Sequence, residues 1–478
     1  MDRTTGFTGL DADSWEMGAQ NWTAGFREEF RKRRGYDPRP YLPVYSGRVV
    51  ESLEVSERFL WDVRMTCQEL LLENHIGHMR TLCHERGLKL SIEPYDMTPT
   101  NDMDLGSFAD IPMGEFWHQG YNSAWSCIEA ASLGHVMGRP IVASEAFTSS
   151  GTWWTKSPWA IKNQGDWALA MGINRFVIHG YAHQPWLDRA PGMIMGGWGL
   201  NWARTQTFWP MVEGYHRYLA RCSHLLQQGV TVSEILYLTP EGAPHVFRAP
   251  DSALHDARGR MPDKLGFGFD ACSPRMLMKR AHVKDGRICF AGGTSYRVLV
   301  LPAVETMTPQ LLAEITALVK AGATVIGSPP VKSPSLSGHP ECDVEVRRLA
   351  ATLWGDLEPP GRMTKRKFGR GTMHWGRAAT DGFYPDYDAT VAVLEELGVS
   401  EDFTSNGPVR HAHRRTEDRE IYFLSNRSAE PVEADCTFRV GNGRPELWDP
   451  MVGTIRRLPQ YRQENGCTNI PMRFAARV

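Results

Sequence analysis

The chain has 478 residues, of which 42% are hydrophobic and 23% charged, and its formal net charge is −2 at pH 7. This length exceeds one ordinary hydrophobic core, so we expect about two to four domains of a globular protein. The near-zero net charge excludes a general electrostatic attraction to nucleic acid or to an anionic membrane. Because no run of about 18 apolar residues occurs, the sequence predicts no membrane-spanning helix.

The nine cysteines are scattered and include no CxxC pair. This spacing argues against a zinc site and against a disulfide framework, and it predicts mostly reduced, buried thiols. The first residues, MDRTTG, do not form a signal peptide, so they leave the localisation open.

Short apolar strands alternate with helices over residues 1–228, which predicts parallel strands joined by right-handed crossovers. The expected strands lie at 7–10, 88–92, 111–116, 140–143 and 174–178. The expected helices lie at 24–34, 51–86, 121–137, 166–171 and 208–228. This pattern fits the C-terminal portion of a (β/α)8 TIM-type barrel. These strands are too few for a whole barrel, so we expect the barrel to be incomplete at its amino end, with the chain entering near the fourth strand.

Two further domains are predicted after the barrel segment. Residues 229–408 contain a βαβ unit over 235–327 and predict an α/β domain of flavodoxin-like or Rossmann-like, glutamine amidotransferase-like type. No GxGxxG or GxxxxGK[ST] motif follows its strands, so we expect a non-catalytic role. Residues 409–478 read as short strands with glycine turns, which predicts a β-sandwich segment that is incomplete.

Four carboxylates follow predicted strands of residues 1–228, namely Glu16, Glu93, Glu115 and Glu145. Aromatic residues accompany them, and thirteen of the sixteen tryptophans fall within the first 209 residues. A lone glutamate at a strand end is usually a surface or capping group. Four of them in one barrel-like region predict a polar active site, because glycoside hydrolysis needs one carboxyl as acid and another as base. The strand position alone does not choose between the four.

Several strings resemble the bacterial α-L-rhamnosidases of glycoside hydrolase family 106, and the resemblance covers nearly the whole chain. They are 13–23 (DSWEMGAQNWT), 33–38 (RRGYDP), 92–95 (IEPY), 113–117 (MGEFW), 144–148 (SEAFT), 179–186 (HGYAHQPW), 238–244 (LTPEGAP) and 447–450 (LWDP). The resemblance implies a (β/α)8 barrel, an inverting mechanism and a calcium ion near the sugar.

The resemblance also implies roles for single residues. The catalytic pair falls on Glu16, as general acid, and Glu145, as general base, although the order of the two roles stays open. Glu115 is the candidate for binding calcium or sugar. The other residues expected to shape the substrate pocket are Asp13, Trp15, Glu93, Tyr95, Trp117, His179 and His183. For each histidine, a structural role remains as good an alternative.

The resemblance implies two partners. One is a rhamnose-containing oligosaccharide or polysaccharide, cleaved at a terminal α-L-rhamnosyl linkage, and the other is a missing N-terminal half of the barrel. The family suggests a periplasmic or secreted protein. We expect Glu16 to be buried beside Trp15, which would favour a protonated acid. Inversion predicts carboxyl groups about 6.5–9.5 Å apart. Two alternatives remain: a catalytically inactive carbohydrate-binding remnant, and a retaining β-glycosidase-like enzyme that uses Glu93 or Glu115 with Glu145.

Overall fold

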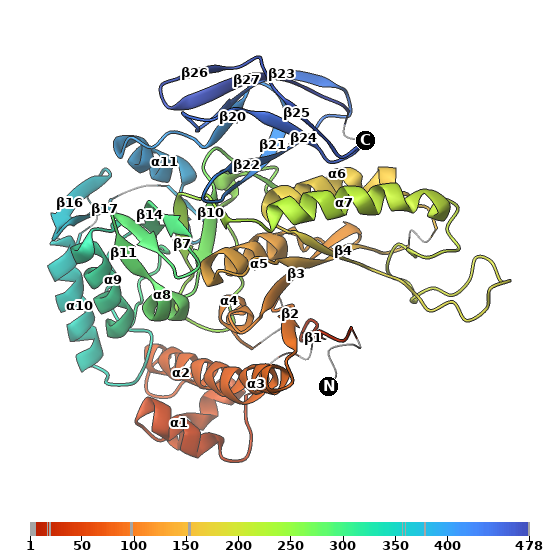
Figure 1. Cartoon of the computed structure of the whole chain (residues 1–478). Coiled ribbons are helices and arrows are strands. Elements are labelled where there is room, and N and C mark those ends of the chain that lie inside the picture. Colours follow the sequence, from red (N-terminus) through yellow and green to blue (C-terminus); the bar gives the residue numbers. More distant parts are fainter. Residues whose placement is uncertain are drawn as a thin grey trace. The chain divides into compact units, whose positions relative to one another are not determined.

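The computed structural model describes residues 6–16, 18, 21–95, 99–151, 154–355, 357–358, 360–376 and 379–476. The chain forms two compact units, each assembled from three segments (Figure 1). Unit 1 contains Met1–Pro112, Glu234–Pro250 and Ala271–Ala392. Unit 2 contains Met113–Ser233, Asp251–Asp270 and Val393–Val478.

Five parallel strands follow one another in the order of the sequence. In unit 1, β1 (Gly9–Ala12) pairs with β2 (Lys89–Ile92), and β2 pairs with the first two residues of β3 (Ile111–Gln119). In unit 2, the remainder of β3 pairs with β4 (Ala143–Ser149), and β4 pairs with β5 (Arg175–Ile178). The predicted parallel strands of a partial barrel are therefore confirmed as a half-barrel type of sheet.

The first predicted strand is displaced by two residues, to Gly9–Ala12. The larger error is in the fourth strand, which begins at Ala143 rather than at residue 140. Asn174 accounts for the difference. Its side-chain oxygen accepts the Val142 backbone N–H at 2.9 Å, and its own N–H donates to the Val142 carbonyl at 2.9 Å. The N–H of Val142 is thus bound by a side chain instead of a neighbouring strand, and Glu145 lies within β4 rather than after it.

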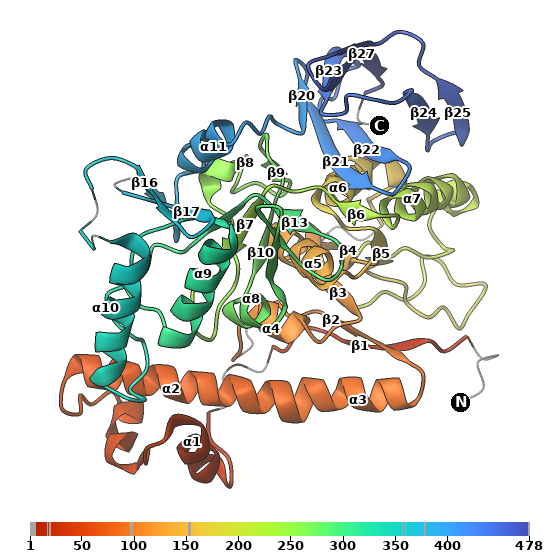
Figure 2. The same cartoon turned by 60° about the vertical axis from the view of Figure 1, so that its left-hand side comes forward.

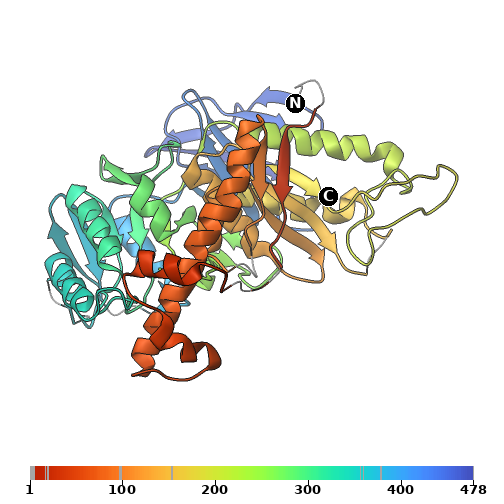
Figure 3. The ribbon, with the colours of Figure 1, turned by 90° about the horizontal axis from the view of Figure 1, so that it is seen from below.

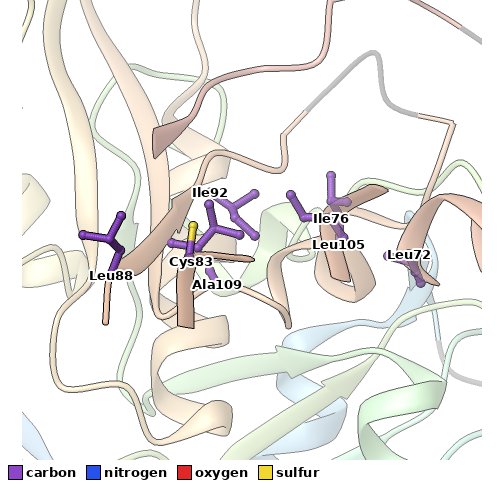
Figure 4. Close-up of a cluster of buried hydrophobic side chains, with 8 residues drawn as sticks. Leu72, Ile76, Cys83, Leu88, Ile92, Leu105 and Ala109 are labelled. Atoms are coloured by element: carbon purple, nitrogen blue, oxygen red, sulfur yellow. The ribbon is translucent and has the colours of Figure 1, made fainter. Parts of the chain in front are cut away.

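A long helical segment supports the strands of unit 1. It consists of α2 (Leu53–Leu71), a π-helical turn (Leu72–Ile76) and α3 (Gly77–Glu85), which form one rod in Figure 2 and are seen from below in Figure 3. Its side chains Leu72, Ile76 and Cys83 recur at helical spacing and face β2. They pack in a buried cluster with Leu88, Leu90, Ile92, Leu105 and Ala109 (Figure 4).

The second sheet of unit 1 confirms the predicted βαβ unit. Its parallel strands are β7 (Ile235–Leu238), β14 (Val298–Val300), β15 (Thr324–Ile326) and β17 (Gly371–Trp375), with β16 (Thr364–Phe368) antiparallel at one edge. All residues of β7, β14 and β15 are buried, as parallel strands covered on both faces require. The crossover helix is α9 (Pro309–Ala321), capped by the Thr308 hydroxyl.

The other elements of unit 1 are short helices and strands. They are α1 (Phe26–Arg34), η2 (Arg39–Ser46), α4 (Asp102–Gly106), α8 (Pro274–Arg280), β11 (His282–Lys284), β12 (Arg287–Cys289), β13 (Ser295–Tyr296), α10 (Glu341–Trp354), β18 (Thr380–Asp381) and β19 (Tyr384–Pro385). Three elements, β3, β10 (Phe269–Cys272) and α11 (Tyr387–Glu396), run through the boundary between the units.

Unit 2 contains the helices that flank β4 and β5 along the chain. They are α5 (Ala124–Met137), α6 (Pro158–Met171) and α7 (Val212–Leu226), with the short elements η4 (Trp209–Met211), β6 (Val230–Thr231), η5 (Asp251–Ala253), β8 (Leu254–His255) and β9 (Asp263–Lys264). All of α5 except its last residue is buried, so it is a core helix rather than an amphipathic surface helix.

The final segment of unit 2 consists of short antiparallel strands, and the predicted β-sandwich stays a prediction. One sheet has the order β20 (Phe403–Ser405), β23 (Val432–Phe438), β27 (Cys467–Phe474) and β26 (Arg462–Glu464), and another has β22 (Glu420–Asn426), β21 (Val409–Arg415) and β6. A hairpin joins β24 (Glu446–Asp449) to β25 (Thr454–Arg457). The domain boundaries expected at 228 and 408 stay predictions. They separate domains that are continuous in the sequence, whereas each of the two units combines three separate segments.

All nine cysteines are free thiols, and five of them are buried. Among the described residues, no helix combines the length and the apolar character needed to cross a bilayer.

A buried histidine joins two carboxylates in unit 2. The His413 ring nitrogens lie 2.9 Å from Asp402 and 2.7 Å from Glu420, and its ring stacks on Tyr422. Burial opposes protonation of His413, but the hydrogen bonds to Asp402 and Glu420 outweigh it and raise its pKa. Only the imidazolium has a proton on both nitrogens, so the charged form satisfies both partners.

We predict that His413→Gln costs about 2 kcal/mol in free energy of unfolding at acidic pH, because two charge-assisted hydrogen bonds are lost. Because folding raises the pKa of His413, its contribution to the free energy of unfolding is fully present at pH values below the ordinary pKa of 6.5. This contribution is lost as the pH rises through the raised pKa. Denaturant unfolding of both proteins at several pH values should therefore show a difference that shrinks toward alkaline pH. The exposed His224→Gln is the control, and a difference independent of pH would contradict the prediction.

Candidate active site

The register between β3 and β4 places two acidic residues beside each other in unit 2. Glu115 pairs with Glu145, between the pairs Gly114–Ser144 and Phe116–Ala146. Because side chains alternate along a strand and paired residues share a face, the two carboxylates lie side by side on one face.

Helix α5 fixes the position of Glu115. The Glu115 N–H donates to the Ser126 hydroxyl at 2.8 Å, and the hydroxyls of Ser126 and Ser123 donate to the Glu115 carbonyl at 2.8 and 2.9 Å. Gly114 permits this approach, since a Cβ there would lie 2.7 Å from the Ser126 carbonyl oxygen. The side chain of Glu115 is buried and accepts the Trp117 indole N–H at 2.5 Å.

A bulge in β4 gives Glu145 its partner. After the Phe116–Ala146 pair the register shifts, and Trp117 pairs with Thr148, so that Phe147 is an extra residue with φ of 65°. Without this bulge, residues three apart would face opposite sides of the sheet. With it, the buried Thr148 hydroxyl donates to Glu145 Oε1. The same oxygen lies 3.7 Å from His179 Nδ1, at the end of β5.

The first acidic motif follows β1 in unit 1. The Ser14 hydroxyl donates to Glu16 Oε1 at 2.8 Å, and Glu16 itself has a left-handed φ of 46°. The expected burial of Glu16 beside Trp15 is wrong, because Glu16 is exposed. The Trp15 indole instead donates to the Gly18 carbonyl at 3.2 Å, and its ring lies edge-on to His75.

The remaining predicted residues of unit 1 follow β2. Glu93 and Tyr95 are both buried, and the Glu93 N–H donates to the Ala12 carbonyl at 2.9 Å. A carboxylate oxygen of Asp13 and one of Glu93 lie within 4.8 Å of each other. Two hard oxygen donors at that spacing fit the coordination sphere of Ca²⁺, whose bonds are about 2.3–2.6 Å long.

The predicted site residues are thus divided between the units. Unit 1 carries Asp13, Trp15, Glu16, Glu93 and Tyr95, and unit 2 carries Glu115, Trp117, Glu145, His179 and His183.

Within unit 2, the structure brings Glu115, Trp117, Glu145 and His179 together, whereas His183 is exposed in the connection after β5.

Sequence reasoning missed two supporting residues. Thr148 belongs to the string around Glu145, but only the bulge at Phe147 turns it toward the carboxylate. Gln164, on α6, donates to the Trp117 carbonyl at 2.9 Å and is buried. Nothing in the local sequence marks Gln164, because its partner is 47 positions away.

The family model described as α-L-rhamnosidase, glycoside hydrolase family 106, matches residues 3–463. The chain belongs to this family. A rhamnosidase from Novosphingobium sp. PP1Y is similar in structure, with a TM-score of 0.85 and 30% identity over 98% of this chain and 44% of that one.

Two other similar proteins have different activities in their names. A protein of Formosa agariphila named "Putative beta-glucuronidase" is 38% identical over 97% of this chain and 37% of its own length. A catalytic mutant of a glycoside hydrolase family 42 β-galactosidase from G. stearothermophilus has a TM-score of 0.55 at 11% identity, over 94% of this chain and 76% of that one, and shares the fold alone. The chain spans less than half the length of the rhamnosidase and of the Formosa protein.

Proposed function

We propose that the chain carries the catalytic residues of an inverting α-L-rhamnosidase. The observation that supports this most is the arrangement around Glu145, a partly exposed carboxylate held by Thr148 beside the paired strand residue Glu115, in a chain of the α-L-rhamnosidase family. A carboxylate oriented by a neutral donor and still reachable by solvent suits a general base.

In this proposal Glu16 is the acid and Glu145 the base. The Glu16 carboxyl donates its proton to the glycosidic oxygen as the bond to the anomeric carbon breaks. A water molecule attacks that carbon from the opposite face, and Glu145 accepts its proton. Glu16 ends as a carboxylate and Glu145 as a carboxylic acid, and proton exchange with solvent restores both. The exposure of Glu16 and its Ser14 contact are compatible with exchange.

The substrate of this proposal is a terminal α-L-rhamnosyl unit on an oligosaccharide or polysaccharide. Rhamnose is a 6-deoxy sugar, so its methyl group calls for an apolar wall, and Tyr95 and Trp117 are the aromatic candidates. Calcium belongs to the same proposal, with Asp13 and Glu93 as its ligands and Glu115 bound to the ion or to the sugar. The ion, when bound, supplies fixed positive charge that orients sugar hydroxyls.

A second candidate activity, β-glucuronidase, is favoured only by the name of the similar Formosa protein. The two candidates use different sugars and different anomeric configurations, so one panel of chromogenic substrates separates them.

We predict hydrolysis of an aryl α-L-rhamnoside and no hydrolysis of the matching β-glucuronide. Because each carboxyl moves a proton in the transition state, Glu16→Gln and Glu145→Gln should each lower kcat by at least about a hundredfold. Glu28→Gln, at an exposed position of α1, is the control. Full activity in both Gln variants would refute the assignment, and a protein that binds rhamnosides without cleaving any would be the inactive remnant.

The Thr148 hydroxyl gives a separate prediction. Thr148→Val keeps the shape of the side chain but removes the donor to Glu145, so kcat should fall about tenfold with KM nearly unchanged. Thr148→Ser, which keeps the hydroxyl, should restore most of the rate. Equal damage in both variants would show that Thr148 acts through packing alone.

Calcium is tested by its removal. Dialysis against a chelator should lower the melting temperature and the rhamnosidase rate, and added Ca²⁺ should restore both. Asp13→Asn or Glu93→Gln should weaken the thermal shift that Ca²⁺ produces, whereas the exposed Glu213→Gln on α7 should not. A Ca²⁺ titration that leaves the melting temperature of the wild type unchanged would contradict the ligand assignment.

A further inference from the structure

The connection between β5 and α7 in unit 2, drawn in yellow-green in Figure 1, exposes an unusual set of large apolar side chains. We call residues 181–198 the aromatic loop. Its exposed members are Tyr181, Trp186, Leu187, Met193, Met195 and Trp198. Trp186 and Trp198 are each 51% exposed, which is costly in water unless the rings have a partner.

A buried amide fixes the shape of the aromatic loop. The Gln184 side chain is bonded twice to Met193, with its Nε2 donating to the carbonyl at 2.7 Å and its Oε1 accepting the N–H at 2.9 Å. Arg204 donates to the Gln184 carbonyl at 2.8 Å. Gly192 has a φ of 91°, a conformation that strains any residue with a side chain, and a Cβ there would also lie 2.2 Å from Gln184 Oε1. The apolar side chains therefore project from a preorganised backbone.

The base of the aromatic loop is bonded to the strands that carry the candidate catalytic residues. The Gly199 N–H donates to Ser149, the last residue of β4, at 2.8 Å, and the Leu200 N–H donates to His179 at 2.9 Å. The Trp198 ring lies 5.5 Å from the Trp117 ring, edge to face, and Trp117 donates to Glu115. Trp198 thus continues the aromatic surface that begins with Trp117 beside Glu115.

We propose that the aromatic loop binds the sugar units on the leaving side of the scissile bond, so that the enzyme favours saccharide chains over small glycosides. This inference rests on the proposed function. The C–H faces of pyranose rings are apolar while their edges are hydroxylated, and indole rings match such a surface. Arg189 lies over the Trp186 ring at 5.1 Å, and its guanidinium adds donors for hydroxyl or carboxylate groups of the saccharide.

The test compares two substrates of the same linkage, an aryl α-L-rhamnoside and a rhamnose-terminated oligosaccharide. Trp186→Ala should lower kcat/KM for the oligosaccharide on the order of tenfold more than for the aryl rhamnoside, mainly through KM. Trp448→Ala, an exposed tryptophan of β24, is the matched control and should leave this ratio unchanged. An unchanged ratio in Trp186→Ala would overturn the proposal.

A binding measurement separates this inference from the proposed activity. In affinity electrophoresis through a rhamnose-containing polysaccharide, the wild type and Trp448→Ala should be retarded and Trp186→Ala should migrate freely. That result supports saccharide binding by the aromatic loop even if the wild type hydrolyses no rhamnoside. Equal retardation of all three proteins would overturn the proposal. So would a Trp186→Ala protein that is retarded like the wild type but elutes as a monomer on size exclusion where the wild type elutes as a dimer, because the aromatic loop would then be a subunit contact.

Discussion

The bulge of β4 at Phe147 is the constraint on which the candidate base depends. A regular strand would hold Glu145 beside Glu115 but would turn Thr148 to the other face of the sheet. The extra residue brings the Thr148 hydroxyl back to Glu145 Oε1, and a second register shift follows in β3, where Trp117 pairs with Thr148 and Gln119 with Ser149. Glu115 is itself bonded to Ser126 of α5 and to Ser123, the residue that precedes this helix. The carboxylate pair is therefore held in place by the buried core of unit 2. A left-handed φ at a bulky residue is strained, and such strain persists only where the surroundings fix it.

Both units hold their irregular segments with buried polar networks rather than with apolar contacts alone. In unit 1, the carboxylate of Asp62 accepts hydrogen bonds from Tyr36, Ser335 and the Leu336 N–H, and Arg58 pairs with Asp343 at 2.7 Å. In unit 2, Gln184 performs this task for the aromatic loop. Removing one member of such a network leaves its partner buried and unsatisfied, which is why these positions tolerate little change.

The sequence predicts those elements whose positions follow from the local pattern of apolar residues. The apolar run 235–238 predicts its strand to the residue, and the helical spacing over 51–86 predicts the long helical segment but not its π-helical turn at 72–76. Three features do not follow from the local pattern. The start of β4 depends on Asn174, 32 positions away, and the role of Thr148 depends on a bulge in the pairing of β4 with β3. Glu16 is exposed although the aromatic Trp15 precedes it. The strings around Glu16 and Glu145 indicated the family correctly, whereas the roles of the single residues remain proposals.

The stereochemistry of the released sugar tests the central claim most directly. Proton NMR, recorded during the first minutes of hydrolysis of an α-L-rhamnoside, distinguishes the two anomers before mutarotation mixes them. An inverting reaction with Glu16 as acid and Glu145 as base predicts β-L-rhamnose as the first product. Release of α-L-rhamnose first would contradict this account and would favour a retaining reaction, in which one carboxylate attacks the anomeric carbon.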